Sequence, residues 1–309
     1  MFSKIRRKSR EWGGAIYDAC FNRPIGCIYM FHMVCPKGDY LAPIDELRVS
    51  PEFFEVFLKK QQKRLEFISI DEVPERMVNQ KKGGKPFGVI TFDDGYEDNY
   101  TYAYPILKKL GIPFTIYVSV NLVNDHTPIW NVPLIIERIV RKHKELTING
   151  NRYLCETDEQ KKETYTILKW LYFAIPYKQK QEEFKNLFAE YLTDDVFPRN
   201  TLSWEQIEEM AKDPLCTIGS HTMSHCRLTL KDQELLHYEL GESKKELEQH
   251  IGKPVEHMSY PHGWKHDVSA EAIAVVEKEG YRTALRSFGG PMRKKDDDFY
   301  QLKRIMIHE

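Results

Sequence analysis

The sequence predicts an α/β fold built around a parallel sheet or barrel, and two observations support this prediction. Short apolar runs alternate with helical patterns along most of the 309 residues, and three clusters of polar residues directly follow three of these runs. A strand–helix–strand order implies right-handed crossovers between parallel strands. Functional residues of such folds collect where the strands end and the loops begin. The three clusters are therefore the candidate functional residues.

The chain before residue 121 sets this rhythm. Its apolar runs predict strands at 26–34, 67–70, 87–92 and 113–120. Two amphipathic patterns, at 50–64 and 102–111, predict the helices between them. The first begins with Ser50 and Pro51, which is typical of a helix start, and the second ends at Gly111.

Strand and helix patterns stop alternating in the middle of the chain and alternate again in its last third. Residues from about 126 to 200 are charged and follow helical patterns throughout. The restored elements are a helix at 203–213 capped by Ser203, a strand at 216–220, a long amphipathic helix at 231–251, a strand ending near 259, a helix at 269–280 and strands at 281–287 and 302–308. We find no repeat and no low-complexity linker. We therefore expect a single domain over residues 1–309 with a helical insertion at about 126–200.

Charge and hydropathy exclude two classes of function. The 45 Lys and Arg residues balance 46 Asp and Glu residues to a net charge of −1, which argues against a nucleic-acid-binding protein. No window of about 18 apolar residues exists, so we expect no membrane span. The basic N-terminal segment at residues 4–10 could touch an anionic membrane surface peripherally, and a solvated terminal helix is the simpler interpretation.

The same N-terminal segment and the cysteines indicate the compartment. The segment lacks the apolar stretch of a signal peptide. The six cysteines form no Cys-x-x-Cys pair, so we expect reduced, buried thiols and a cytoplasmic location.

Each polar cluster contains residue types that suit metal-assisted hydrolysis. The clusters are Asp93 and Asp94 after VITF, His221 and His225 in CTIGSHTMSH, and Tyr260, Pro261 and His262 in HMSYPHG. Two histidines four residues apart on a helical turn present their rings on one side. Such a pair alone is weak support for a metal site. Two histidines and one carboxylate, however, form a ligand set that leaves positions open for water and substrate.

A metal ion would also explain why two aspartates stand side by side. One carboxylate could bind the ion while its neighbour acts as general base on a water whose pKa the ion lowers. The alternative is that Asp-Asp-Gly forms only a turn or a helix cap, which these residues also favour. The presence of the two histidines favours the metal.

The motifs TFDDG, GSHTMSH and YPHG, in this order, resemble those of the NodB-type polysaccharide deacetylases, carbohydrate esterase family four. The resemblance runs from about residue 26 to 308 and is interrupted by the 126–200 insertion. YMFHMV, SPEFFEVFL, FISIDE and LKRIMI extend it. It implies a distorted (β/α)7 barrel and hydrolysis of an N-acetyl, less often an O-acetyl, group on a sugar.

The resemblance also assigns roles to residues. Asp93 matches the general base, and the metal ligands are matched by Asp94, His221 and His225. The third motif supplies Tyr260 and Pro261 to the substrate site, and the backbone N–H of His262 to the oxyanion. One divalent ion is implied. Zinc is the first expectation, and cobalt, nickel, manganese and iron are alternatives that these ligands also suit.

Two positions depart from the family pattern, and one role has two candidates. Many members carry an arginine two residues before the proline of the third motif, and this sequence has Ser259 there. The usual aromatic residue after that proline is His262. The general acid is either His32 on the first strand or His308 near the end of the chain. His32 is favoured, because YMFHMV and LKRIMI match the branch that uses the early histidine.

The expected substrate is an acetylated sugar, a glycolipid or a polysaccharide precursor, for instance one linked to a nucleotide or a lipid. Two alternatives remain: a sugar-binding protein with impaired catalysis, of which Ser259 would be a sign, and a metal-dependent amidohydrolase on a non-sugar amide. The aromatic residues of the insertion could stack on sugar rings, but their helical spacing favours packing for most of them. They are Trp130, Trp170, Tyr172, Phe173, Tyr177 and Phe188.

Overall fold

Seven parallel strands close into a barrel within the part of the chain that the computed structural model describes, residues 24–38, 46–79, 84–124, 132–176, 179–193, 196, 201–294 and 296–309. In order around the barrel the strands are β1 (Pro24–Phe31), β5 (Phe87–Phe92), β6 (Phe114–Val118), β9 (Cys216–Ser220), β10 (His257–Ser259), β11 (Thr283–Gly289) and β13 (Leu302–Met306). β1 pairs in parallel with both β5 and β13, and these two pairings close the ring. The predicted distorted (β/α)7 barrel is confirmed.

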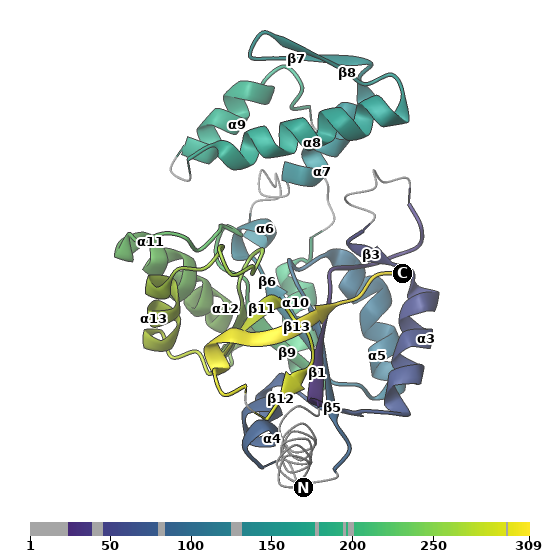
Figure 1. Cartoon of the computed structure of the whole chain (residues 1–309), viewed down its shortest axis with the longest axis vertical. Helices are drawn as coiled ribbons and strands as arrows, with labels where there is room; N and C mark the ends of the chain where they lie inside the picture. The colour runs from purple at the N-terminus through teal and green to yellow at the C-terminus, as the bar shows by residue number, and fades with distance from the viewer. Residues whose placement is uncertain are drawn as a thin grey trace, which may run out of the picture.

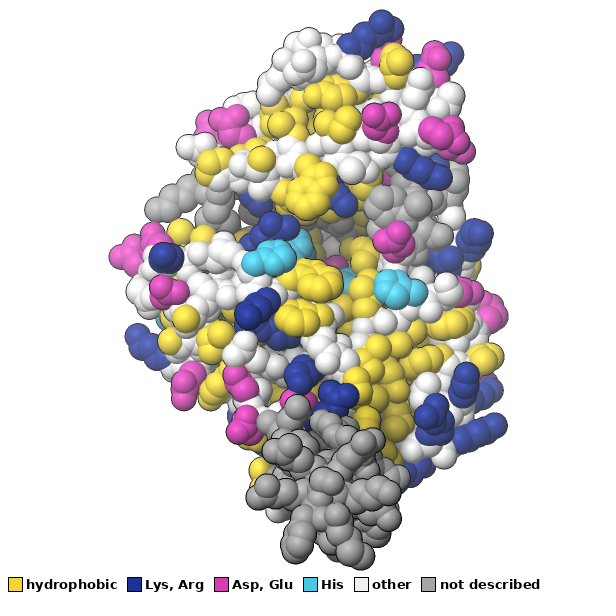
Figure 2. Space-filling model, in the orientation of Figure 1, with side chains coloured by type: hydrophobic (Ala, Val, Ile, Leu, Met, Phe, Trp, Pro, Cys, Tyr) yellow, Lys and Arg dark blue, Asp and Glu magenta, His cyan; other side chains and the backbone are white. Residues whose placement is uncertain are grey.

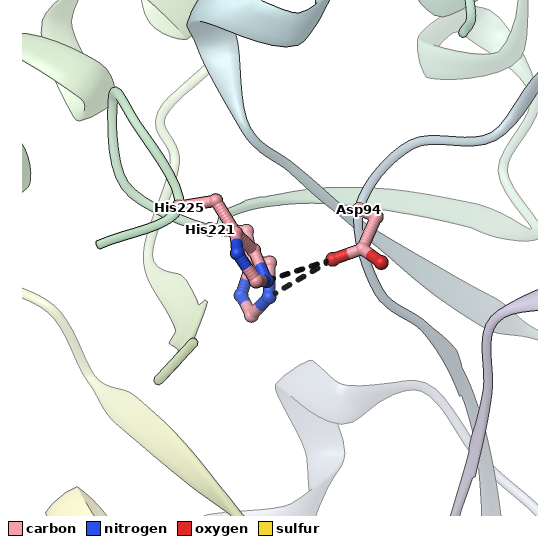
Figure 3. A group of neighbouring side chains, drawn as sticks. All are labelled: Asp94, His221 and His225. Carbon is pink, nitrogen blue, oxygen red and sulfur yellow. Dashed lines mark ion pairs between the residues drawn. The ribbon is translucent and has the colours of Figure 1, made fainter. Parts of the chain in front are cut away.

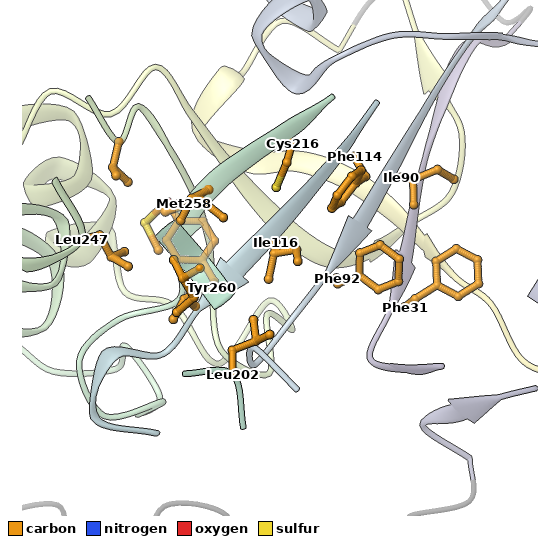
Figure 4. Packing of buried hydrophobic residues seen from close by; sticks show 14 of the residues in the cluster. Phe31, Ile90, Phe92, Phe114, Ile116, Leu202, Cys216, Leu247, Met258 and Tyr260 are labelled. Atoms are coloured by element: carbon orange, nitrogen blue, oxygen red, sulfur yellow. The ribbon is translucent and has the colours of Figure 1, made fainter. Parts of the chain in front are cut away.

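Alternation along the strands separates an outer core from the barrel interior. On β5, Ile90 and Phe92 belong to the cluster that packs under the surrounding helices, together with Phe31, Phe114 and Ile116 (Figure 4). Phe87 and Val89 belong to a second cluster with inward residues of other strands. Because successive side chains of a strand point to opposite faces, the odd-numbered series on β5 continues through Thr91 to Asp93. The first aspartate of the pair thereby lies at the top of the barrel interior.

Helices and short strands surround the barrel (Figure 1). The helices are α3 (Pro51–Gln62), α4 (Val73–Asn79), α5 (Tyr104–Leu110), α6 (Val120–Asn124), α10 (Trp204–Lys212), α11 (Gln233–His237), α12 (Ser243–Ile251) and α13 (Ala270–Lys278). The peripheral strands are β2 (Met33–Val34), β3 (Arg48–Val49), β4 (Glu66–Phe67) and β12 (Met292–Arg293). The predicted caps are present: Ser50 accepts the N–H of Phe53 at the start of α3, and Ser203 forms a capping box on α10.

The insertion forms a separate layer over one end of the barrel (Figure 1). Its elements are α7 (Val132–Lys142), β7 (Glu145–Ile148), β8 (Asn151–Leu154), α8 (Asp158–Ala174) and α9 (Lys180–Phe188). Most residues of its apolar core come from these elements, although Met33 and Tyr96 of the barrel loops join them. The insertion follows β6 and α6, so it leaves the barrel at the carboxyl end of a strand and covers that end.

Three elements differ from the sequence prediction. The insertion is not helical throughout, because β7 and β8 form a hairpin whose turn residues Asn149 and Gly150 have φ angles of 50° and 72°. An Asn-Gly pair between two alternating segments is the usual signal for such a turn. The predicted strand 67–70 is limited to β4, since Ser69 caps a 3₁₀ turn at Ile70–Glu72. A π-helical segment, Tyr238–Glu242, divides the predicted helix 231–251.

The other expectations concern the thiols, the membrane and the N-terminus. The five described cysteines form no disulfide bond; Cys155, Cys216 and Cys226 are buried, whereas Cys27 and Cys35 are half-buried. No helix in the described residues is both long and apolar enough to cross a bilayer. Cys20 and the basic residues 4–10 lie outside the described residues.

Candidate active site

A cavity of about 840 Å³ lies between the carboxyl end of the barrel and the insertion. Figure 2 shows the hollow, with apolar and histidine side chains around it. The barrel contributes at least one residue from each of the three polar clusters, and the insertion contributes residues that include Tyr172 and Phe173 from α8. The barrel mouth and the insertion thus enclose one site. Of the other insertion aromatics, Phe188 is buried in the insertion core, Trp170 is 55% exposed, and Trp130 and Tyr177 lie outside the described residues.

Three side chains from two strand ends converge on one point of this cavity (Figure 3). Asp94 Oδ1 lies 3.3 Å from Nε2 of His221 and 3.1 Å from Nε2 of His225. The three ligand atoms all lie within 4.8 Å of one another. The structure therefore brings together the carboxylate and the two histidines that the sequence singled out as ligands.

The hydrogen bonds around the cluster fit a divalent metal ion. Nδ1 of His221 lies 2.8 Å from the carbonyl oxygen of Ser259, so Nδ1 carries a proton, and in the neutral ring Nε2 keeps its lone pair toward Asp94. Asp94 Oδ1 is buried and has no hydrogen bond from the described residues, despite the two nearby nitrogens. A buried carboxylate oxygen that faces imidazole lone pairs needs a cation. The donor set suits zinc and its neighbours in the transition series.

The histidine pair lies on a loop and not on a helical turn, which corrects the sequence prediction. Thr222 and His225 have φ angles of 69° and 52°, in the left-handed region. Glu239, fully buried in the π-helical segment, accepts the N–H and the hydroxyl of Ser224 at 2.9 and 2.6 Å. These bonds hold the loop in a conformation that brings the two rings to 5.0 Å between centroids. Glu239 is a positioning residue that the sequence analysis missed.

Asp93 is held in the barrel interior by an arginine that the sequence analysis also missed. The guanidinium of Arg304, on β13, donates to Asp93 through Nη1 at 2.7 Å and Nη2 at 2.6 Å, and both side chains are buried. Ser259 donates its hydroxyl to Asp93 at 3.0 Å. Burial alone would raise the pKa of Asp93, but the charge and hydrogen bonds of Arg304, together with the nearby histidines, outweigh burial and hold that pKa below its ordinary value.

This arrangement changes the meaning of Ser259. The sequence analysis treated it as the loss of an arginine that pairs with the base, yet an arginine reaches Asp93 from another strand. Ser259 itself contacts both Asp93 and the ring of His221. The signal in the sequence was a charged residue at an inward position of LKRIMI, where Leu302 and Met306 are the apolar neighbours on the same face.

The two candidates for the general acid lie in different surroundings. His32 follows β1 and lines the cavity with the two aspartates, and its Nδ1 is buried without a hydrogen-bond partner among the described residues. Burial lowers its pKa, and the nearby Asp94 and Asp93 carboxylates partly offset this effect. His308 is exposed, does not line the cavity, and places Nδ1 3.1 Å from the carbonyl oxygen of Glu46.

The third motif contributes His262 to the cavity but not Tyr260. The His262 ring lies 5.0 Å from that of His225, and its backbone adopts a φ of 60°. Its N–H has no acceptor among the described residues, as an oxyanion donor requires. Tyr260 lies in the outer core and donates its hydroxyl to the carbonyl of Tyr300 at 2.9 Å. Tyr260 and the buried Pro261 do not line the cavity, and their contact with substrate stays a prediction.

A second group of ligand types, Asp71, Glu256 and His257, lies at the opposite end of the strands. Both ring nitrogens of His257 already have partners: Nε2 lies 2.8 Å from Asp71 and Nδ1 lies 2.8 Å from the hydroxyl of Thr283. We assign these bonds to closure of the barrel bottom and place no metal there.

Comparison with known proteins identifies the family. The family model described as polysaccharide deacetylase matches residues 80–284, which is more than half of the chain. The chain therefore belongs to the polysaccharide deacetylase family. Membership indicates a hydrolase that acts on acetylated sugar polymers.

Individual relatives agree with this assignment at low sequence identity. YxkH of Bacillus subtilis (strain 168) is 24% identical over 281 residues, which cover 91% of this chain and 70% of YxkH. The deacetylase PplD of Streptococcus pyogenes, solved with acetate, superposes with a TM-score of 0.61 at 19% identity and covers 93% and 94% of the two chains. BA0330 of Bacillus anthracis gives a TM-score of 0.58 at 22% identity over 91% of this chain, which spans 64% of that protein. These structures establish the shared fold.

Proposed function

We propose that this protein removes an acetyl group, N-acetyl more readily than O-acetyl, from a sugar polymer or its precursor, and that it depends on one divalent metal ion. One observation carries the proposal. An ionised carboxylate, Asp93, lies beside the cluster of Asp94, His221 and His225 at the mouth of a barrel whose family is known. A metal ion held by these three residues would supply an activated water and polarise the acetyl carbonyl.

The remaining steps fall to side chains around the cluster. Asp93, oriented by Arg304 and Ser259, accepts the proton of the attacking water. The N–H of His262 donates to the oxygen that becomes negative as the carbonyl carbon turns tetrahedral. His32 faces the same cavity and donates a proton to the departing nitrogen. Its lowered pKa makes its protonated form a stronger acid. An amine needs this proton to leave, which favours the N-acetyl substrate.

The first test joins metal content to acetate release. We expect the purified protein to bind about one divalent ion per chain and to lose acetate release after chelation. Added zinc should restore it, and cobalt, nickel or manganese are the alternatives to compare. Asp94→Ala and His221→Ala should lose the ion. The exposed His266, at 77% side-chain exposure, provides the matched control His266→Ala.

Asp93→Asn should keep the metal and lower kcat by about 10²–10⁴-fold, because the base is removed while the three ligands remain. Full metal binding by both ligand variants would contradict the ligand assignment. Loss of the ion from Asp93→Asn would exchange the roles of the two aspartates.

A further inference from the structure

The charged residues that line the cavity differ in whether a group of opposite charge lies beside them. They are Asp93, Asp94, Lys169 and Lys180. Asp93 is neutralised by Arg304, and Asp94 belongs to the metal cluster. The two lysines both come from the insertion, Lys169 from α8 and Lys180 from the first turn of α9. With the carboxylates already matched, the wall formed by the insertion leaves a surplus of positive charge over the site.

Neither lysine has a counter-ion among the described residues. Both side chains are half-buried, and burial lowers the pKa of each. Neither forms an ion pair or a hydrogen bond with a carboxylate in the described parts of the chain, and the charge of Glu46 only partly offsets the effect of burial on the pKa of Lys169. Each ammonium group lies over an aromatic ring, Lys169 over Tyr165 at 5.4 Å and Lys180 over Tyr172 at 4.9 Å, but no opposite charge matches it. Partial burial of a cation without an opposite charge is costly, unless a ligand supplies that charge.

The position of Lys180 links this charge to the metal cluster. Its Nζ lies 4.9 Å from the ring centroid of Tyr172 and 5.5 Å from that of Phe173. The Phe173 ring lies 5.6 Å from that of His262, which in turn lies 5.0 Å from the ring of the ligand His225. Two ring contacts therefore separate the ammonium group from a metal ligand. The cavity that these residues line has a volume of about 840 Å³, which is within the size range of small-molecule sites.

Arg227 adds a third cation to the positive potential on the insertion side of the cavity. Arg227, two residues after His225, lies with Cζ 5.3 Å from the centroid of Phe173. Its Nε is 3.4 Å from Asp267, so part of its charge is already matched. The lysines, which face the cavity, are therefore better placed than Arg227 to receive an anion.

We propose that the substrate carries an anionic group, a phosphate or a carboxylate, and that Lys169 and Lys180 bind this group while the acetylated sugar lies over the metal cluster. The inference rests on the proposed deacetylation. It goes further, because it makes the insertion the part of the chain that selects an anionic substrate over a neutral polymer. Ammonium groups suit this role, since they bind phosphate and carboxylate oxygens as point charges.

The kinetic test compares three probes that differ in charge: methyl N-acetylglucosaminide, N-acetylglucosamine 1-phosphate and N-acetylmuramic acid. We expect kcat/KM for acetate release to be at least about tenfold higher for an anionic probe than for the neutral one. Lys169→Met and Lys180→Met should each lower this ratio about fivefold or more, while the arginine variants should retain most of it. The exposed Lys162 and Lys185, on the same two helices, provide the controls Lys162→Met and Lys185→Met, which should leave the ratio unchanged.

A binding measurement separates this inference from the proposed function. Calorimetry with pyrophosphate should show binding that weakens in Lys180→Met and with rising salt, but not in Lys185→Met. If no probe releases acetate and this binding persists, the deacetylase proposal fails while the anion site stands. A wild-type ratio near one, or a ratio that the lysine variants leave unchanged, would overturn the anion site. The phosphate and carboxylate probes show which of the two anions it selects.

Discussion

At the scale of single residues, the pair of Asp93 and Arg304 is the most consequential contact in the site. The two residues are 211 positions apart, buried, and joined by two hydrogen bonds. Removal of one partner from a buried ion pair leaves an unmatched charge and costs about 3–5 kcal/mol of stability. This contact therefore serves both the fold and the proposed base.

We expect Arg304→Met to lower the free energy of unfolding by about 3 kcal/mol, and Asp93→Asn/Arg304→Met to lower it by less than the sum of the two single changes. Urea titrations measure both effects. The lost guanidinium should also raise the pKa of Asp93, so the acid limb of the kcat/KM profile should move to higher pH. Arg282→Met, at an exposed ion pair with Glu256, is the control. Additive stabilities would show that the pair is not coupled.

A second residue-scale prediction concerns the general acid. His32→Ala should lose activity on an amide substrate, because its amine leaves poorly without a proton. It should lose less on an activated aryl ester, whose leaving group needs none. His308→Ala should be mild on both, because its side chain lies outside the cavity. If His308→Ala selectively abolishes amide cleavage, the roles are reversed.

At the scale of elements, Asp98 and its neighbour Asn99 join the segment of His32 and β2 to the loop that carries Asp93 and Asp94. Its Oδ1 accepts the N–H of Val34 at 3.0 Å and the side-chain amide of Asn99 at 2.8 Å. Asn99 also donates to the carbonyl of His32 at 2.8 Å. Burial raises the pKa of Asp98 to about 7. The Asp98 carboxyl group that links the two segments therefore titrates near neutral pH.

The sign of the resulting pH dependence follows from linkage. The folded pKa lies above the unfolded one, so folding binds a proton between these values, and the protonated form stabilises the fold. This stability is fully present below the unfolded pKa and is lost as the pH rises through about 7. Asp98→Asn should therefore stabilise the protein at pH 8 relative to wild type, by on the order of 1 kcal/mol more than it does at pH 5. Thermal melts at the two pH values, with the exposed Asp297→Asn as control, test this. An equal stability difference between Asp98→Asn and wild type at both pH values would refute this pH dependence.

At the scale of the whole molecule, the insertion is attached to the barrel at two neighbouring points. Asn124 at the end of α6 accepts a hydrogen bond from the indole N–H of Trp204 on α10 at 2.8 Å, so the residues that flank the insertion meet. The insertion core is built mainly from its own elements. We propose that the chain is one barrel domain into which a separately packed unit has been inserted.

Replacement of residues 125–200 by a short Gly-Ser linker should therefore leave a folded barrel. We expect a cooperative melt and about one bound metal ion per chain, because the ligands all lie on the barrel. Acetate release should fall, since the cavity loses Tyr172 and Phe173. Circular dichroism and metal analysis measure the outcome. A shortened chain that cannot fold or bind metal would show that the insertion belongs to the barrel core.

The sequence by itself determined the local features of this protein. The apolar run at 87–92 and the caps at Ser50 and Ser203 predicted elements, because each is set by neighbours along the chain. The motifs around Asp94, His221 and His225 predicted the ligand cluster, and the family resemblance that they carry implied the barrel. The Asn149–Gly150 pair was a signal for the hairpin that the prediction of a helical insertion missed.

Only the tertiary structure decided which distant residues meet. Closure of the ring through β1 and β13 places Arg304 against Asp93, and the path of the chain after β6 sets Lys180 over the mouth of the barrel. The tertiary structure also places His32 in the cavity and His308 outside it, although both residues follow strands. Strand order, register and closure depend on contacts between segments hundreds of residues apart. Periodicity along one segment carries no information about them.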